Sequence, residues 1–241
     1  MPKQKPTSRP FYVSVSGLGK FFTCPAMYDY SRKYVYTGPL SPALQMGINV
    51  HAALAGTKDE EELSTTEAVY LKKLRILELP YEIQGRELQQ DVPLTVGIRL
   101  VRVVDALARL EGEPVLLDYK TARVPWFTIS GHVPEAWGWQ ASAYLIPPED
   151  VKEWPKQIHF LTAPLEGQPE VHAYSRILKD LDHVKQAALI VRSAVRYGWL
   201  PKRQGWLCKN CDFADLCYDV PNWWQTVRLK KEVRNGQDHP E

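Results

Sequence analysis

Two aspartates and a lysine stand in a segment whose pattern predicts a β-hairpin, and their spacing could build a cation site. Residues 99–120 form two β-like apolar runs around Glu111-Gly112, a pair that suits a two-residue hairpin turn. Closing that turn sets Asp105 opposite Asp118, and the Cβ atoms of such cross-strand partners lie about 4.5–5.5 Å apart. Lys120 is two residues beyond Asp118, so both side chains point to the same face of the strand.

This arrangement has a chemical use. Two neighbouring carboxylates repel each other, and burying them without compensation is costly. A divalent cation removes that cost, and clustered carboxylates are the hard ligands that Mg²⁺ or Mn²⁺ prefers. Lys120 could then position or deprotonate a water, or stabilise charge that develops on a phosphate. The alternative is a surface salt bridge between Asp118 and Lys120, and a one-residue slip of register would separate the carboxylates.

The same residues carry a family resemblance. Asp105, followed after 13 residues by Asp118-Tyr119-Lys120-Thr121, resembles the motif pair of the PD-(D/E)XK nuclease superfamily, specifically its RecB-like exonuclease branch. Gly47-Ile-Asn-Val-His51 is similar to the G-x3-H motif of that branch, and Gln140-Ala-Ser-Ala-Tyr144 to its Q-x3-Y motif. One departure is Arg102, which stands where the branch often has a glycine.

The resemblance implies a set of site residues. It implies metal ligation by His51, Asp105, Asp118 and the Tyr119 carbonyl, and a catalytic group of Asp105, Asp118, Lys120, Gln140 and Tyr144. Without the resemblance, His51 would be read as a structural histidine, and Gln140 and Tyr144 as packing on one helix face. Glu87, in the strand before the hairpin, could add a metal contact or lie on the surface.

Four cysteines suggest a second metal centre. Cys208, Cys211 and Cys217 form C-x2-C-x5-C, and Cys24 lies 184 residues before Cys208. Structural disulfides are uncommon in a cytoplasmic protein, so metal binding is the leading use for such closely spaced thiols. Four thiolates suit a zinc ion or an iron–sulfur cluster. The three-plus-one arrangement, with Pro25 after the remote cysteine, resembles the 4Fe-4S cluster of RecB-like nucleases, with Zn²⁺ as the alternative.

Basic and aromatic residues surround the C-terminal cysteines. Lys202 and Arg203 could hold the phosphates of a DNA strand while neighbouring rings stack on its bases. The alternative is that the rings cover the cluster and the core. The rings in question are Trp199, Trp206, Phe213, Tyr218, Trp223 and Trp224.

The elements that must position these residues alternate between helical and β patterns. Helices are expected over about 14–30, 42–56, 60–79, 135–146 and 178–197, and strands over 82–120, 156–162 and 169–175. Helices that enclose a central mixed β-sheet make an α/β fold. The resemblance implies a restriction-endonuclease-like core whose N- and C-terminal segments join at the four cysteines.

The expected organisation is a single nuclease domain between two ends of low complexity. A basic arm over 1–10 precedes a RecB-like domain over 11–220, and a tail covers 221–241. Within that domain, the resemblance places the nuclease core at about 40–176. The iron–sulfur region then combines 14–36 with 178–220.

Composition is that of a globular protein. Of the 241 residues, 44% are hydrophobic and 24% charged, which argues against a wholly disordered chain. The net charge of +2 divides into +5 over 1–36, −7 over 37–184 and +4 over 185–241. Basic ends could bind phosphates around an acidic, metal-binding centre, although solvated faces also differ in charge by chance. No apolar run approaches the ~20 residues of a membrane span, and no signal-peptide pattern opens the chain, so a cytoplasmic location is expected.

These observations predict a metal-dependent deoxyribonuclease that acts as an exonuclease on DNA ends or single strands. The resemblance implies a role in recombination, repair or phage DNA metabolism. Two alternatives stay open: a CRISPR-adaptation nuclease that trims spacer precursors, and a non-catalytic DNA-binding scaffold with a structural metal cluster. The expected partners are DNA and an integrase or recombination protein, with no membrane.

Overall fold

The structure is a computed structural model of the chain, and its atoms fall into two compact units. It describes residues 9–123, 135–149, 151–175, 177–205, 208–209, 211–220 and 227–230. The first unit combines residues 1–15 with 41–188, and the second combines 16–40 with 189–241. Each unit is therefore assembled from two separate stretches of the sequence.

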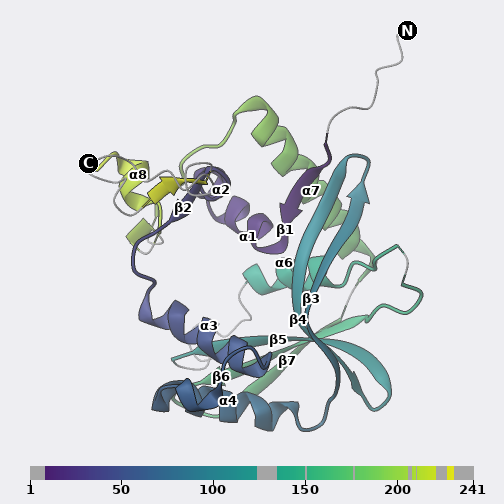
Figure 1. Cartoon of the computed structure of the whole chain (residues 1–241). Helices are drawn as coiled ribbons and strands as arrows, with labels where there is room; N and C mark the ends of the chain where they lie inside the picture. The colour runs from purple at the N-terminus through teal and green to yellow at the C-terminus, as the bar shows by residue number, and fades with distance from the viewer. Residues whose placement is uncertain are drawn as a thin grey trace. The chain divides into compact units, whose positions relative to one another are not determined.

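The first unit is built on a six-stranded mixed sheet, which confirms the predicted α/β class (Figure 1). The sheet has the order β1-β4-β5-β6-β7, and β3 pairs with β4 beside this path. β1 is parallel to β4 and β5 is parallel to β6, whereas the other pairs are antiparallel. The strands are β1 (Phe11–Ser14), β3 (Glu82–Thr95), β4 (Ile98–Leu110), β5 (Glu113–Ala122), β6 (Gln157–Pro164) and β7 (Glu170–Ser175).

Helices α3 (Pro42–Leu54) and α4 (Thr65–Glu78) pack on one face of this sheet. Their apolar side chains share a core with alternate residues of β4, β5 and β6, because successive strand residues point to opposite faces. This core contains Val50, Leu54, Tyr70, Leu71, Leu74, Ala106, Ala108, Leu117, Tyr119 and Leu161.

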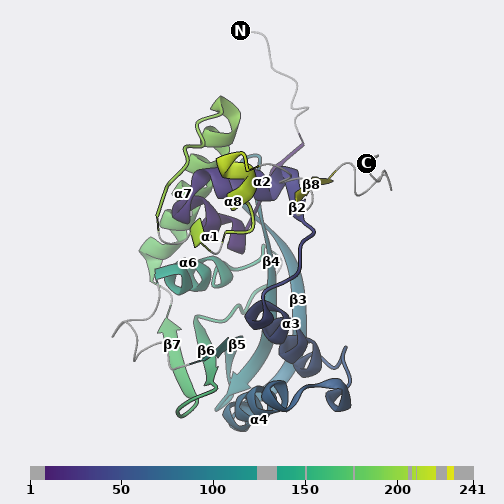
Figure 2. The same ribbon diagram turned by 90° about the vertical axis from the view of Figure 1, so that its left-hand side faces the viewer.

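Helix α6 (Glu135–Tyr144) covers the other face, as Figure 2 shows. Its Trp137 stacks on Phe160 of β6 with ring centroids 5.0 Å apart. Phe160 and Leu161 are neighbours in β6, so their side chains point to opposite faces of the sheet. Leu161 packs in the core with α3 and α4, and Phe160 packs against α6.

The β4–β5 hairpin has the predicted register. Its pairs run from Leu110↔Glu113 to Ala106↔Leu117. Both turn residues have positive φ, 53° at Glu111 and 87° at Gly112, as a tight two-residue hairpin turn requires. The register thus brings Asp105 opposite Asp118 one step beyond the last pair.

Two predicted helices are each divided in the structure. The expected helix over 14–30 follows directly after β1 and is two helices, α1 (Val15–Thr23) and α2 (Pro25–Lys33), with Cys24 at the N-cap of α2. Proline at the first helical position starts a new helix, because its missing N–H would find no partner there.

The helix expected over 60–79 begins later than predicted. A short 3₁₀ turn, η1 (Glu60–Glu62), precedes α4. Ser64 caps α4, and its hydroxyl accepts from the Glu67 N–H while the Glu67 carboxylate accepts from the Ser64 N–H. This reciprocal capping fixes the start of α4 at Thr65.

The second unit contains α1, α2 and, among its described residues, three short elements that the sequence pattern does not predict. β2 (Tyr34–Tyr36) pairs antiparallel with β8 (Val227–Leu229), and α8 (Ala214–Tyr218) carries Cys217. β8 lies within the stretch expected to be a tail, and most of that stretch lies outside the described residues. α7 (Leu178–Tyr197) runs from the first unit into the second, since the units divide after Ala188.

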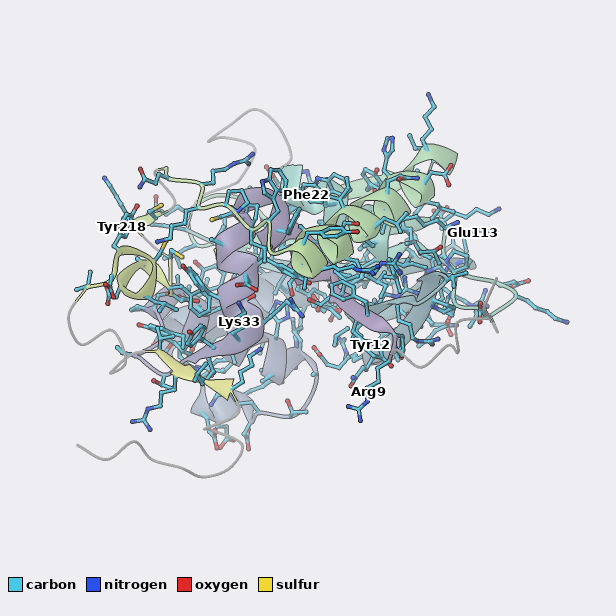
Figure 3. All side chains as sticks on the ribbon, turned by 90° about the horizontal axis from the view of Figure 1, so that it is seen from above. Arg9, Tyr12, Phe22, Lys33, Glu113 and Tyr218 are labelled. Carbon is cyan, nitrogen blue, oxygen red and sulfur yellow. The ribbon has the colours of Figure 1, made fainter. Side chains whose placement is uncertain are left out.

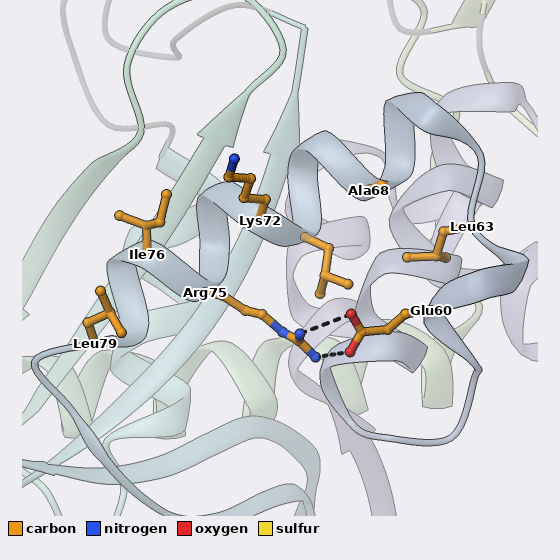
Figure 4. A pocket seen from close by; sticks show the side chains of 8 residues that line it. Glu60, Leu63, Ala68, Lys72, Arg75, Ile76 and Leu79 are labelled. Atoms are coloured by element: carbon orange, nitrogen blue, oxygen red, sulfur yellow. Dashed lines mark hydrogen bonds and ion pairs between the residues drawn. The ribbon is translucent and has the colours of Figure 1, made fainter.

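Among the described residues, no helix is long and apolar enough to cross a membrane. A groove of about 370 Å³ lies between η1 and α4, where the Arg75 guanidinium binds the Glu60 carboxylate (Figure 4). None of the predicted site residues lines this groove; its apolar walls are Leu63, Ala68, Leu71, Ile76 and Leu79.

Candidate functional site

The predicted aspartates meet where β4 and β5 separate. Beyond the Ala106↔Leu117 pair, an Asp105 carboxylate oxygen accepts from the backbone N–H of Tyr119 at 2.8 Å. The side chain of Asp105 thus takes the place of a strand partner at this N–H.

Asp118, Lys120 and helix α6 form one hydrogen-bonded group. The Asp118 side chain is 2% exposed and pairs with the Lys120 ammonium. Gln140 joins the two, because its Nε2 donates to Asp118 Oδ1 at 2.9 Å and its Oε1 accepts from Lys120 Nζ at 3.1 Å. Gln140 Nε2 also donates to the hydroxyl of Tyr144, 3.1 Å away on the same helix face. The structure therefore brings these four predicted residues together.

His51 lies beside the same strand ends. Its Nε2 is 3.1 Å from the Tyr119 carbonyl oxygen, which can only accept, so the ring carries its proton on Nε2. Nδ1 then keeps its lone pair and lies 3.6 Å from Asp105 Oδ2. Burial lowers the pKa of His51 below its ordinary value, which favours the neutral form that a metal ligand needs.

Glu87 completes a group of three possible metal ligands. Ligand atoms of His51, Glu87 and Asp105 all lie within 4.8 Å of one another. Glu87 has φ 51°, a left-handed backbone that costs a non-glycine residue about 1–2 kcal/mol. The sequence pattern of β3 gives no sign of this backbone conformation, and it left open whether Glu87 adds a metal contact or lies on the surface.

Electrostatics favour a cation at this position. Burial and the negative charge of Asp118 hold the pKa of Asp105 well above its usual range, although the Tyr119 N–H opposes the shift. A nearby positive ion would favour the ionised carboxylate again. A neutral imidazole and two or three carboxylates are donors that suit a small divalent cation, so the residues present fit Mg²⁺ or Mn²⁺.

All four cysteines belong to the second unit and are free thiols. The pKa of Cys211 is raised, first by burial and further by the charges of Asp212, Cys24 and Cys217. Tyr218, labelled in Figure 3, interacts with Cys208 and has a raised pKa, mainly because of that hydrogen bond.

Lys202 and Arg203 contact the backbone around these thiols. The Lys202 ammonium donates to the carbonyl oxygen of Cys217. Arg203 donates from its guanidinium to the Phe22 carbonyl at 2.8 Å, and its backbone N–H lies 3.5 Å from Cys24 Sγ. Among the aromatic neighbours, Trp199 is 69% exposed and Phe213 is buried, whereas Trp206, Trp223 and Trp224 lie outside the described residues.

Three solved structures are similar to this chain. A protein from Eubacterium rectale named "Putative exonuclease" is 15% identical, with a TM-score of 0.56 over 88% of this chain and 92% of that one. An alkaline exonuclease from Laribacter hongkongensis is 14% identical, with a TM-score of 0.41 over 78% and 92% of the two chains. The structure of LHK-Exo in complex with dAMP is 14% identical, with a TM-score of 0.40 over 77% and 88%. No curated protein matches the chain.

The family comparison covers the sheet and the site described above. Residues 12–218 match the PD-(D/E)XK nuclease superfamily. That stretch includes β4, β5 and α6, and so every residue of the group built around Asp105 and Asp118. The chain therefore belongs to the PD-(D/E)XK nuclease superfamily.

Proposed function

We propose that this protein is a metal-dependent DNA exonuclease that hydrolyses phosphodiester bonds at DNA ends or in single strands. The observation that carries the proposal is the bridge of Gln140 between Asp118 and Lys120, adjacent to the His51, Glu87 and Asp105 group. A protein that only binds DNA would gain nothing from carboxylates set against phosphates, because like charges repel.

The metal site would use His51, Asp105 and Asp118, with the Tyr119 carbonyl and Glu87 as further donors. A divalent cation bound there would lower the pKa of a water and neutralise charge on the scissile phosphate. His51 would bind through Nδ1, since Nε2 carries the proton in the present tautomer.

The remaining residues would act on protons and orientation. Lys120 Nζ, held by Asp118 and Gln140, would hold a proton at the edge of the metal site and donate to a phosphate oxygen. Gln140 would hold the side chains of Lys120 and Asp118 in fixed positions, because it bonds to both. Tyr144 would limit the rotation of the Gln140 amide. Fixed donors of this kind lower a barrier because they need little reorganisation during the reaction.

The choice of DNA ends or single strands follows from the RecB-like motifs rather than from the geometry. The fold likeness to the Eubacterium rectale protein, whose name gives it as an exonuclease, agrees with this choice. The biological setting would be recombination, repair or phage DNA metabolism. Trimming of spacer precursors beside an integrase is the second candidate, and the arrangement of the four cysteines fits both candidates equally.

We further propose that Cys24, Cys208, Cys211 and Cys217 hold a 4Fe-4S cluster, with Zn²⁺ as the alternative. The charges of Cys24 and Cys217 both raise the pKa of Cys211, which supports a centre that the three thiols share. Lys202 and Arg203 are exposed, and each uses only part of its donors on the Cys217 and Phe22 carbonyls, so we propose that their remaining N–H groups bind DNA phosphates while these contacts brace the cysteine region.

The test is cleavage of labelled single- and double-stranded DNA with Mg²⁺, Mn²⁺ or EDTA. Wild-type protein should release nucleotides from DNA ends with either metal and none with EDTA. Lys120→Ala should lose nearly all turnover, whereas the exposed matched control Lys72→Ala should cleave normally. Metal-independent cleavage, or full activity of Lys120→Ala, would contradict the proposal.

A further inference from the structure

Arg102 is the largest fully buried side chain of the chain as described, with 2% of its surface exposed. It lies on β4, three residues before Asp105, where the RecB-like branch often has a glycine. A buried guanidinium is costly unless its donors are used. Burial lowers the pKa of Arg102 to about 10, so the side chain stays charged at neutral pH.

The contacts of Arg102 converge on the C-terminal end of helix α6. Its NH1 group donates to the carbonyl oxygens of Ala143 at 2.9 Å and Tyr144 at 2.7 Å. The last carbonyls of a helix have no partner within the helix and carry partial negative charge, so a cation binds well there. Arg102 thus provides the hydrogen bonds that water would otherwise donate to these two carbonyl oxygens.

Two further residues hold the guanidinium in place. Gln90 of β3 accepts from Arg102 Nε at 2.7 Å, and the guanidinium lies over the Trp154 ring, 4.7 Å from its centroid. Trp154 also donates from its indole N–H to the Tyr144 carbonyl at 3.0 Å. Only NH2 of Arg102 has no hydrogen-bond partner among the described residues. The planar cation therefore joins β3, β4 and α6 at one point.

Helix α6 is the element that carries Gln140 and Tyr144 to Asp118 and Lys120. The Gln140 amide must reach a carboxylate with one atom and an ammonium with the other, so a small shift of the helix would break one of the two bonds. Hydrogen bonds weaken steeply beyond their normal distances. The end of α6 that Arg102 holds is one turn away from this amide.

We propose that Arg102 is a positioning residue of the active site: by binding the last carbonyls of α6, it keeps Gln140 bonded to both Asp118 and Lys120. This inference rests on the proposed nuclease function. Lysine cannot replace arginine fully, because an ammonium has no planar face for Trp154 and no rigid fork for two carbonyls and Gln90.

The test is a double-mutant cycle on steady-state DNA cleavage by the full-length protein with Mn²⁺. Arg102→Met should lower kcat about 10- to 100-fold, the range seen when a supporting contact of a site residue is lost. KM and the Kd for Mn²⁺ should change little, because the proposed metal ligands lie outside α6. In a Gln140→Ala background the same substitution should cost less than about threefold, since the residue through which it acts is gone.

Matched variants separate positioning from a general loss of stability. Arg99→Met removes a half-exposed arginine from the same strand, and its kcat should equal that of the wild type. Trp154→Phe keeps the aromatic ring but removes the donor to Tyr144, so it tests the same helix end if Arg102→Met does not fold. It should lower kcat less than Arg102→Met and show the same dependence on Gln140. Amide hydrogen exchange over 141–145 should rise in both variants.

Three results would overturn the inference. The first is an equal loss of kcat in the wild-type and Gln140→Ala backgrounds. The second is a lower melting temperature with unchanged kcat, and the third is unchanged exchange over 141–145. Lys120→Ala distinguishes the two levels of failure: if it is inactive while Arg102→Met cleaves normally, only the role of Arg102 is wrong. If Lys120→Ala keeps full activity, the nuclease proposal and this inference fail together.

Discussion

The two aspartates of the hairpin have different surroundings although they are near neighbours. Asp118 is matched by Lys120 and by the Gln140 amide, whereas Asp105 accepts one backbone N–H and has a raised pKa. Asp118 is therefore held within a group of charge-assisted hydrogen bonds, whereas a cation bound beside Asp105 would favour the ionised form of that carboxyl.

Replacing Asp118 tests its place in the active site. Asp118→Asn keeps the side-chain volume but removes the charge that faces Lys120 and the proposed cation. Cleavage should fall about a hundredfold or more, a loss typical of removing one preorganised electrostatic contact. The fold should survive, because Asn can still accept from Gln140, and circular dichroism would verify it. Activity within a few-fold of the wild type would remove Asp118 from the active site.

Glu87 combines backbone strain with a functional position. A glutamate at φ 51° is uncommon, and such strain persists where the surrounding structure enforces it. The neighbouring Arg86 is fixed by Tyr119 and Glu78, since its guanidinium donates to the Tyr119 hydroxyl at 2.8 Å and pairs with Glu78. This anchorage on β3 holds the Glu87 carboxylate near His51 and Asp105.

Substitution by glycine separates the strain from the ligand. Glu87→Gly should raise the free energy of unfolding of the metal-free protein by up to about 1 kcal/mol, because glycine adopts positive φ without steric cost. The same variant should bind Mn²⁺ more weakly by calorimetry. Glu111→Gly is the matched control: its φ is 53°, so it should gain similar stability with unchanged Mn²⁺ affinity. Equal Mn²⁺ affinities in both variants would exclude Glu87 as a ligand.

At the scale of elements, local patterns in the sequence are sufficient for some features. The turn residues Glu111 and Gly112 fix the β4–β5 register, and this register is enough to place Asp105 opposite Asp118. The four-residue spacing of Gln140 and Tyr144 places both side chains on one face of α6, where the structure joins them. These features depend on neighbours in sequence, which a pattern contains.

Other features depend on partners far away in the sequence. β1 has only four residues and exists as a strand because it pairs with β4, nearly 90 residues later. In the sequence, Arg102 is only a departure from the family pattern. In the structure, its hydrogen bonds to the Ala143 and Tyr144 carbonyls give it a structural role. No local pattern specifies such contacts, so neither could be predicted.

His159 provides a pH-dependent contact between elements. Its Nδ1 lies 2.7 Å from the Tyr81 hydroxyl, which joins β6 to the segment between α4 and β3. Burial lowers the pKa of His159 below its ordinary 6.5, so its contribution to stability is present above pH 6.5 and is lost as pH falls from 6.5 through the lowered pKa of the folded state. Between pH 7.5 and 5, the melting temperature should fall more for the wild type than for His159→Gln. An equal fall would show that protonation of His159 does not lower the free energy of unfolding. His51, whose pKa is also lowered, contributes equally to both proteins.

At the scale of the whole chain, the second unit is assembled from its two ends. Residues 16–40 supply Cys24, and residues 189–241 supply the other three cysteines. A bound cofactor would link these two stretches across most of the sequence. Such a link restricts the unfolded chain strongly, because the closed loop is long, and binding to the folded form adds free energy that the unfolded chain lacks.

The remote cysteine is therefore the decisive position for the proposed cluster. Protein purified without oxygen should be brown, with broad absorption near ~400 nm and on the order of four irons per chain. Cys24→Ala should lose this absorption and melt at a lower temperature, because metal binding and folding are coupled. Thr23→Ala, at the neighbouring position, should retain both iron and stability. Cleavage should persist in part in Cys24→Ala, since the β4–β5 hairpin belongs to the first unit.

Colourless protein with one zinc per chain would replace the cluster with a zinc site. Full iron content and unchanged melting in Cys24→Ala would remove Cys24 from the ligands, and the two ends of the chain would then need another explanation for their association.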